Sequence, residues 1–290
     1  MPLIGSGQPP REMVDAEHYV PELLQGFLLA LEGTRRSSDV WDLLVRLGRQ
    51  VGLPFVDFVV TASLQDWKKT LFIRTSYEAD WLQALHSDPE LGRWTYFRDH
   101  AMRYLTPVLV GLEFVDEYRQ VPPERVEHLR EAARRGLRAG FSVPLRQHAP
   151  PQAGLITFSG DISARQMRVI ARSHGWVLHT AALTGHQRYM QHFTSEFPER
   201  NHLTAKQIEL LTMIGRGLKD REIAEALGVS VSAVRQRLGT LHTNTGVPSR
   251  TELAALAMTV GLLPMPTEPG HDSADTRVLI ESDGGPFAEH

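Results

Sequence analysis

Arginine, glutamine and serine side chains gather in the segment from Gly228 to Arg250, which holds no aspartate or glutamate. Its arginines are Arg235, Arg237 and Arg250. Guanidinium groups bind phosphates and guanine edges, while serine and glutamine side chains can hydrogen-bond to bases. The whole chain carries a formal net charge of −3, so a nucleic acid would have to be bound by a local patch such as this one.

The elements around this patch are short helices with clear start and stop signals. Thr204 and Gln207 have the spacing of a capping box before an apolar run. Asp220 is placed to cap the next helix, which Gly228 ends, and a third helix is expected from Ala233 to about Thr243. Two short helices joined by a tight turn are typical of a helix-turn-helix, whose second helix enters the DNA major groove. A plain four-helix bundle with one exposed basic helix is the alternative.

The same region resembles the LuxR-type helix-turn-helix signature from Leu203 to Leu263. The matching positions are Leu203-Thr204, Gly217, Glu222-Ile223-Ala224, Leu227, Val229-Ser230, Val234, Gly246-Val247, Arg250 and Gly261-Leu262. The resemblance implies a transcription regulator that binds a double-stranded DNA operator as a homodimer. By the same resemblance, the DNA-binding residues would be Ser232, Arg235, Gln236, Arg237 and Gly239.

The N-terminal part mixes helix and strand patterns. Apolar residues at helical spacing predict helices, and runs rich in β-branched and aromatic residues predict strands. We expect an α+β fold, an α/β/α sandwich with a central antiparallel sheet, followed by an all-α four-helix domain. The predicted helices are 20–31, 40–51, 124–135 and 163–183, and the predicted strands are 55–62, 70–75, 141–145 and 153–159.

This part is similar to the autoinducer-binding domain of quorum-sensing regulators. Tyr77 and Trp81 stand four residues apart, as do the family's residues that line an acyl-homoserine lactone pocket. Ser159 falls where the family often has a hydroxyl that bonds the ligand carbonyl. The remaining likeness covers Ala132-Ala133, Gly136-Leu137, Gly140, Val143-Pro144-Leu145 and the strand that ends at Ser159.

Two polar anchors of that family are displaced or missing. An Asp-Pro is expected thirteen residues after Trp81, where this chain has Trp94, and its own Asp88-Pro89 comes earlier. The family's tryptophan three residues after a proline is also absent, since Pro107 is followed by Val108-Leu109-Val110. Asp88 is the candidate replacement anchor. Either the ligand is not a standard homoserine lactone, or the domain binds no ligand and serves for dimerisation.

Composition and motif searches exclude several other classes. The chain has no cysteine, no long apolar run and no secretory leader pattern, so we expect a cytoplasmic protein without disulfides or a membrane anchor. A phospho-acceptor receiver domain needs a pair of acids at the end of its first strand, and the sequence has none there. Neither Ser142 nor Ser159 stands in the G-x-S-x-G motif of acyl hydrolases. We therefore expect no enzyme activity and no catalytic residue, and we also expect no cofactor and no metal site. The expected organisation is a flexible tail (1–16), a sensor or dimerisation domain (17–188), a linker (189–201), the DNA-binding domain (202–264) and a disordered tail (265–290).

Overall fold

The structure is a computed structural model that describes residues 21–61, 70–78, 100, 103–118, 121–147 and 152–263. It divides the chain into two compact units, residues 1–196 and 197–290, which are described separately below. The expected tails at 1–16 and 265–290 lie outside the described residues.

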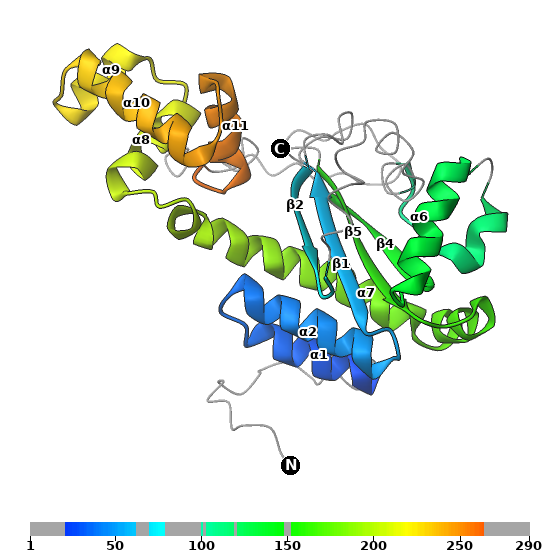
Figure 1. Ribbon diagram of the computed structural model, residues 1–290. Helices are drawn as coiled ribbons and strands as arrows, with labels where there is room; N and C mark the ends of the chain where they lie inside the picture. The colour runs from blue at the N-terminus through cyan, green and yellow to red at the C-terminus, as the bar shows by residue number, and fades with distance from the viewer. Residues whose placement is uncertain are drawn as a thin grey trace, which may run out of the picture. The chain divides into compact units, whose positions relative to one another are not determined.

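A five-stranded antiparallel sheet forms the centre of the first unit (Figure 1). Its strands lie in the order β2-β1-β5-β4-β3, and every neighbouring pair is antiparallel. The predicted antiparallel sheet among helices is therefore confirmed, whereas the short strand β3 was not predicted. The strands are β1 (Phe55–Thr61), β2 (Thr70–Thr75), β3 (Val108–Val110), β4 (Ala139–Gln147) and β5 (Gln152–Gly160).

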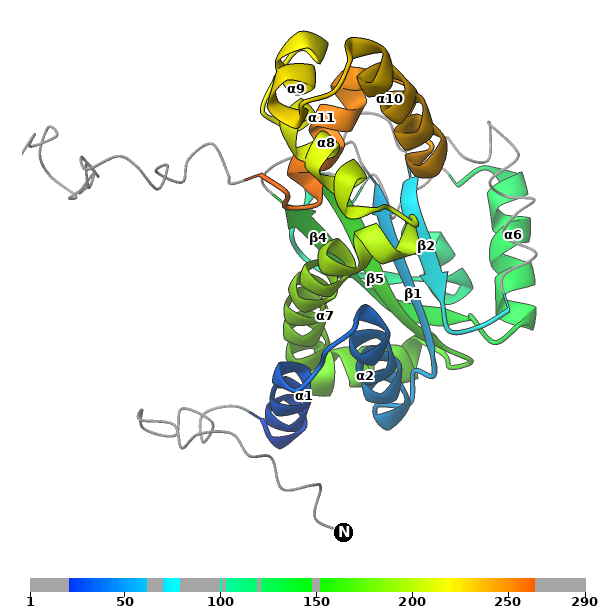
Figure 2. The ribbon, with the colours of Figure 1, turned by 90° about the vertical axis from the view of Figure 1, so that its left-hand side faces the viewer.

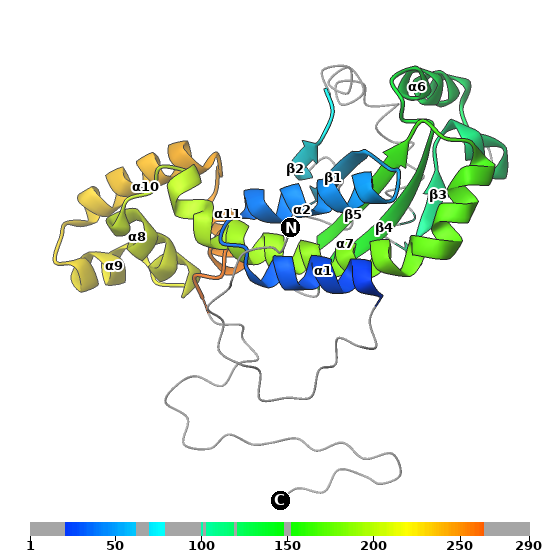
Figure 3. The same ribbon diagram turned by 90° about the horizontal axis from the view of Figure 1, so that it is seen from below.

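Three helices cover one face of this sheet. They are α1 (Glu22–Glu32), α2 (Ser37–Gln50) and α7 (Ala164–Arg200). Val56 and Phe58 of β1 point into this layer and are fully buried in the same apolar cluster as Leu44 and Leu178. Figures 2 and 3 show the helix α6 (Pro123–Arg134) on the other side of the sheet. The 3₁₀ helix η2 (Leu112–Glu117) follows β3 in the chain, and its Phe114 is buried in the same apolar cluster as Val56 and Phe58.

The last sheet-covering helix, α7, is longer than the sequence pattern predicts. We expected an irregular, exposed linker from residue 189, but residues 189–200 are helical and Tyr189 is only 2% exposed. Tyr189 stacks on Phe193 and meets Phe58 edge-on, at ring distances of 6.1 and 5.1 Å. Pro198 cannot donate a backbone hydrogen bond, but it stands close to the end of the helix, where losing one bond costs little against this packing.

The described part of the second unit, residues 197–263, contains four short helices around its own apolar core. They are α8 (Ala205–Gly215), α9 (Asp220–Leu227), α10 (Val231–Thr245) and α11 (Arg250–Thr259). The predicted capping box is present: the backbone N–H of Gln207 donates to the Thr204 hydroxyl at 3.3 Å, and that of Thr204 donates to Gln207 Oε1 at 2.9 Å. Asp220 begins α9 instead of capping it. Glu222 accepts from the N–H of the cap residue, Lys219, which leaves Asp220 available for arginine partners.

A buried carboxylate joins α7 to the start of α2. Ser37 is the first residue of α2, so its N–H has no acceptor within the helix. Glu196 accepts from this N–H and from the Ser37 hydroxyl, both at 2.8 Å. The anion also lies at the positive end of the helix dipole.

We expect Glu196→Ala to lower the free energy of unfolding by about 1–3 kcal/mol, because it removes the acceptor that Glu196 provides to the buried N–H and hydroxyl of Ser37. Urea denaturation followed by circular dichroism measures the loss. Glu196→Gln keeps one acceptor oxygen and should lose less. Equal stability of Glu196→Ala and the unmodified chain would contradict this account.

A second buried polar group on α7 is the imidazole of His186. Its ring meets Phe58 edge-on at 5.5 Å, and among the residues that the structure describes Nδ1 has no hydrogen-bond partner. Burial favours the neutral form and lowers the pKa of His186 to about 4.

The depressed pKa predicts a pH-dependent loss of stability. The ordinary histidine pKa is 6.5, so between pH 6.5 and about 4 the unfolded chain binds a proton that the folded chain does not. Stability should therefore fall as pH falls through this window, by at most about 1.4 kcal/mol per pH unit from this group. Urea denaturation at several pH values should show a shallower slope for His186→Met. The matched control, His174→Gln at a partly exposed site on α7, should keep the original slope; an unchanged slope in His186→Met would refute the assignment.

Candidate functional site

A row of polar side chains crosses the sheet on the face opposite α1, α2 and α7. Asp57 of β1 pairs with Thr75 of β2 on one side and with Thr157 of β5 on the other. Thr157 in turn pairs with Ser142 of β4. Side chains alternate between faces along a strand, so Asp57 points away from the layer that buries Val56 and Phe58. The row therefore belongs to the other face.

Asp57 is the ionisable member of this row. Asp57 is half-buried, and desolvation raises the pKa of its carboxyl to about 7, although the Thr157 hydroxyl beside it opposes the rise. The Ser142 and Thr157 hydroxyls are 3.1 Å apart and buried. Sequence reasoning missed Asp57. The available signal was an acid in the middle of the apolar strand FVDFVVT.

Tyr77 lies on the same face as Asp57. It follows β2, and its ring meets Phe55 edge-on at 6.1 Å; Phe55 and Asp57 alternate onto one face of β1. The Ser76 hydroxyl accepts from the N–H of Val56 at 2.8 Å and so fixes this turn against β1. Burial first, and the charge of Asp57 second, raise the pKa of Tyr77, which keeps its hydroxyl protonated. Among the described residues, the Tyr77 hydroxyl has no hydrogen-bond partner.

Ser159 is the second predicted ligand residue that the structure describes. It pairs with Phe55 across β1 and β5 and with Gly140 across β4 and β5. A Cβ at Gly140 would lie 2.7 Å from the Ser159 hydroxyl oxygen, so the absent side chain leaves room for this hydroxyl. Tyr77 and Ser159 are thus both beside Phe55, while the other predicted ligand residues, Trp81 and Asp88, lie outside the described residues.

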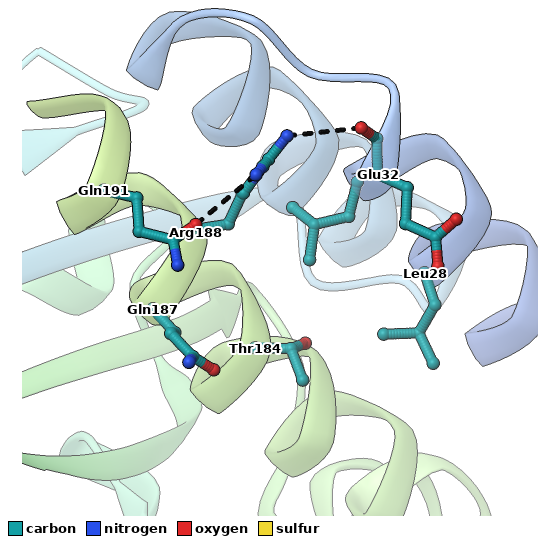
Figure 4. Close-up of a pocket in the computed structure, with 7 residues that line it drawn as sticks. Leu28, Glu32, Thr184, Gln187, Arg188 and Gln191 are labelled. Atoms are coloured by element: carbon teal, nitrogen blue, oxygen red, sulfur yellow. Dashed lines mark hydrogen bonds between the residues drawn. The ribbon is translucent and has the colours of Figure 1, made fainter. Parts of the chain in front are cut away.

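A groove lies on the opposite layer, between α1 and α7. It has a volume of about 410 Å³, and its arginine, Arg188, bonds to neighbouring groups of the protein (Figure 4). Arg188 donates to the carbonyl oxygens of Glu32 and Thr34 at 3.3 and 3.2 Å and to the Gln191 side chain at 3.4 Å. The groove is lined by Leu28, Leu31, Glu32, Thr184, Gln187, Arg188 and Gln191.

The predicted DNA-binding residues lie on α10 of the second unit. Val234, Leu238 and Leu241 point into the core, so the exposed face is the one that carries Ser232, Gln236 and Gly239. Nothing lies within 4 Å of a Cβ placed at Gly239, so this part of the helix is open to close approach.

The two arginines of α10 differ in position. An α-helix turns about 100° per residue, which places Arg235 near Gly239 and turns Arg237 toward the side of the core. The Arg235 side chain is 74% exposed and Arg237 is only partly exposed. The structure therefore groups four of the five predicted residues and sets Arg237 apart from them.

Asp220 connects this face to the rest of the unit. Its carboxylate binds Arg250 Nη1 at 2.7 Å and lies 3.5 Å from Arg235 Nε. Arg250 also donates to the carbonyl oxygen of Leu218. Arg250 is thus engaged in holding α11 to the segment before α9, whereas the mostly exposed Arg235 has a weaker, exchangeable partner.

Two other features, a metal-binding cluster and a membrane-spanning helix, are absent from the described part of the chain. No group of three or more histidine, aspartate or glutamate side chains there is arranged to hold a metal ion. No described helix is both long and apolar enough to cross a membrane.

Comparison with known proteins finds one matching family model and several similar proteins. The family model described as "Autoinducer binding domain" matches residues 36–189, more than half of the chain. Curated relatives match shorter stretches. The transcriptional regulatory protein YdfI of Bacillus subtilis is 43% identical over 61 residues, which are 21% of this chain and 29% of that protein. The response regulator Rre1 of a Synechocystis species is 36% identical over 69 residues, 24% and 30% of the two chains. This chain thus spans under a third of the length of either relative.

Two solved structures match at low sequence identity. SdiA of Escherichia coli is 18% identical with a TM-score of 0.49 and covers 83% of this chain and 98% of its own. CepR2 of Burkholderia cenocepacia, named an N-acylhomoserine lactone dependent LuxR family transcription factor, is 15% identical with a TM-score of 0.47 and covers 59% and 96%. The assignment rests on the family match. The chain belongs to the family of proteins that carry an autoinducer-binding domain, and the predicted kinship with LuxR-type quorum-sensing regulators is confirmed.

Proposed function

We propose that this chain is a transcription regulator that binds an operator through α10 and responds to a small molecule bound at the Asp57 face of its sheet. The observation that carries the proposal is the exposed, acid-free face of α10 in a chain with an autoinducer-binding domain. The two curated relatives, by name a transcriptional regulatory protein and a response regulator, support the same class of function.

The α9–α10 pair has the features of a helix-turn-helix. Gly228 ends α9 with φ +62°, a left-handed conformation that glycine adopts without strain. The Ser230 hydroxyl then accepts from the N–H of Ala233 and caps α10. This tight turn would let α9 brace against the DNA backbone while α10 enters the major groove.

Arg235 is the proposed base-reading residue of α10. We expect Arg235→Ala to weaken binding to an operator selected from random sequences by about 1–3 kcal/mol, because a bidentate contact to guanine would be lost. Fluorescence anisotropy at fixed salt measures the change, with random-sequence DNA in parallel.

The matched control is Arg216→Ala, which removes the same charge from the exposed C-terminal cap of α8. It should change both affinities little. Equal losses on operator and random DNA for Arg235→Ala would assign Arg235 to phosphate contact alone, and no loss on either would remove it from the interface. A full chain that binds no DNA at all would refute the proposed function.

We propose a homodimer as the active form, because two recognition helices can then read a two-fold operator. Three large apolar side chains on α7 support a helix-to-helix contact between copies. Val169, Trp176 and Leu183 are spaced seven residues apart and are 59%, 67% and 42% exposed. A seven-residue repeat forms the stripe along which two helices pair, and an isologous contact needs the same patch on both copies.

Trp176→Glu should convert the dimer to a monomer, because it places a charge in an apolar contact. Analytical ultracentrifugation of the full chain over a range of concentrations measures the change. Leu29→Glu, at a 42% exposed leucine on α1, is the control and should leave the dimer intact. A Trp176→Glu chain that still dimerises like the unmodified chain would exclude this stripe as the interface.

A further inference from the structure

We propose that the groove between α1 and α7 receives the Trp176 side chain of a second copy of this chain, so that the two α7 helices pair antiparallel about an axis near Thr180. This inference rests on the proposed homodimer, since it names the surface that receives the partner.

The groove adjoins the exposed apolar stripe of α7. That stripe is formed by Val169, Trp176 and Leu183. An α-helix turns about 100° per residue, so Gln187, four residues after Leu183, stands only about 40° round the helix from it. Gln187 also lines the groove. A second copy that covers the stripe therefore meets the groove as well.

The groove is large enough for an indole ring. Its volume is about 410 Å³, whereas a cavity of about 150 Å³ already admits benzene. Leu28 and Leu31 give it an apolar wall on α1, and Thr184 lies on the α7 side (Figure 4). The Arg188 guanidinium, held by two backbone carbonyl oxygens, can stack on an aromatic ring there.

Spacing along α7 favours the antiparallel direction. Val169 and Trp176 are seven residues apart, and so are the groove residues Thr184 and Gln191. In an antiparallel pair centred near Thr180, Trp176 lies opposite the partner's Thr184, and Val169 lies opposite the partner's Gln191. Both apolar side chains then reach the groove, and the two-fold axis repeats the contact on each copy. In a parallel pair, Trp176 would meet the partner's Trp176 and leave the groove empty.

The size of the contact also favours use of the groove. Residues 169–191 span about 34 Å of helix, so a strip one helix wide, about 10 Å, would bury roughly 350 Å² per copy. Stable interfaces bury about 800 Å² per partner. A helix seated in the groove contacts the α1 wall of each copy in addition to α7, which brings the contact toward that size.

Cysteine cross-linking of the full chain tests the direction of pairing. The chain has no cysteine of its own, so introduced cysteines report single contacts. In the double variant Ser173→Cys/Gln187→Cys, residue 173 of one copy faces residue 187 of the other, and mild oxidation should give a covalent dimer. Each single variant should give little, because its two cysteines would lie about 21 Å apart along the paired helices, too far for a disulfide. A Ser173→Cys chain that cross-links as readily as the double variant would indicate parallel pairing and overturn the proposal.

An exchange of side-chain size tests the groove itself. Trp176→Ala removes the inserted ring and Thr184→Trp fills the groove, so each should weaken dimerisation by roughly tenfold or more, as loss of a central anchor does. In the combined variant Trp176→Ala/Thr184→Trp, the ring at 184 meets the space left at the partner's residue 176. Its dissociation constant should return to within roughly threefold of the unmodified value, because neighbouring changes compensate only where the two positions touch. Analytical ultracentrifugation measures the constants, and circular dichroism melting checks that each variant is folded.

The matched control is Ala30→Trp, which adds the same ring at an exposed position of α1, about 160° round the helix from Leu28. It should leave the dimer intact. The proposal fails if Thr184→Trp dimerises like the unmodified chain, or if the combined variant dimerises no more tightly than the single variants. The proposed function is judged separately by operator binding, so a chain that dimerises and binds its operator but fails these tests would remain the proposed regulator with a different contact between its copies.

Discussion

The alternation of side chains along β1 is the constraint on which the sensor unit depends. Val56 and Phe58 must both enter the apolar layer formed by α1, α2 and α7, and this fixes the register of the strand. A carboxylate between them cannot turn into that core. It is held toward the opposite face, beside Thr157 and close to Tyr77. The packing of one face therefore decides which polar groups the other face presents.

Elements that depend on neighbouring residues were easier to predict from the sequence than contacts between distant segments of the chain. The strand at 70–75 and the Thr204–Gln207 capping box follow from residue types that are neighbours in the chain, and both were predicted correctly. The extension of α7 beyond residue 188 was not, because Pro198 suggested a break and the packing of Tyr189 on Phe58 comes from a distant segment. Asp57 was missed for a similar reason, since only the strand register shows that it meets Thr157.

In the second unit, one carboxylate, that of Asp220, interacts with two arginines that have different roles. Glu222 accepts from the N–H of Lys219, the cap residue of α9, so the Asp220 carboxylate can bind Arg250 closely and Arg235 loosely. Val234, Leu238 and Leu241 mark the side of α10 that faces the core. From these three residues, helical periodicity would have placed Arg237 away from the exposed face. A resemblance to a family indicates which positions correspond, but it does not show which way each side chain points.

The hydroxyls of Thr157 and Ser142 have a directional consequence. The Ser142 and Thr157 hydroxyls are 3.1 Å apart, and either of them can be the donor. When Asp57 is ionised, its charge favours the arrangement in which Thr157 donates to Asp57 and Ser142 donates to Thr157, because a hydroxyl has one proton to give. When Asp57 is protonated, that preference is lost. The charge state of one residue on β1 therefore bears on the orientation of a hydroxyl on β4, two strands and about 10 Å away.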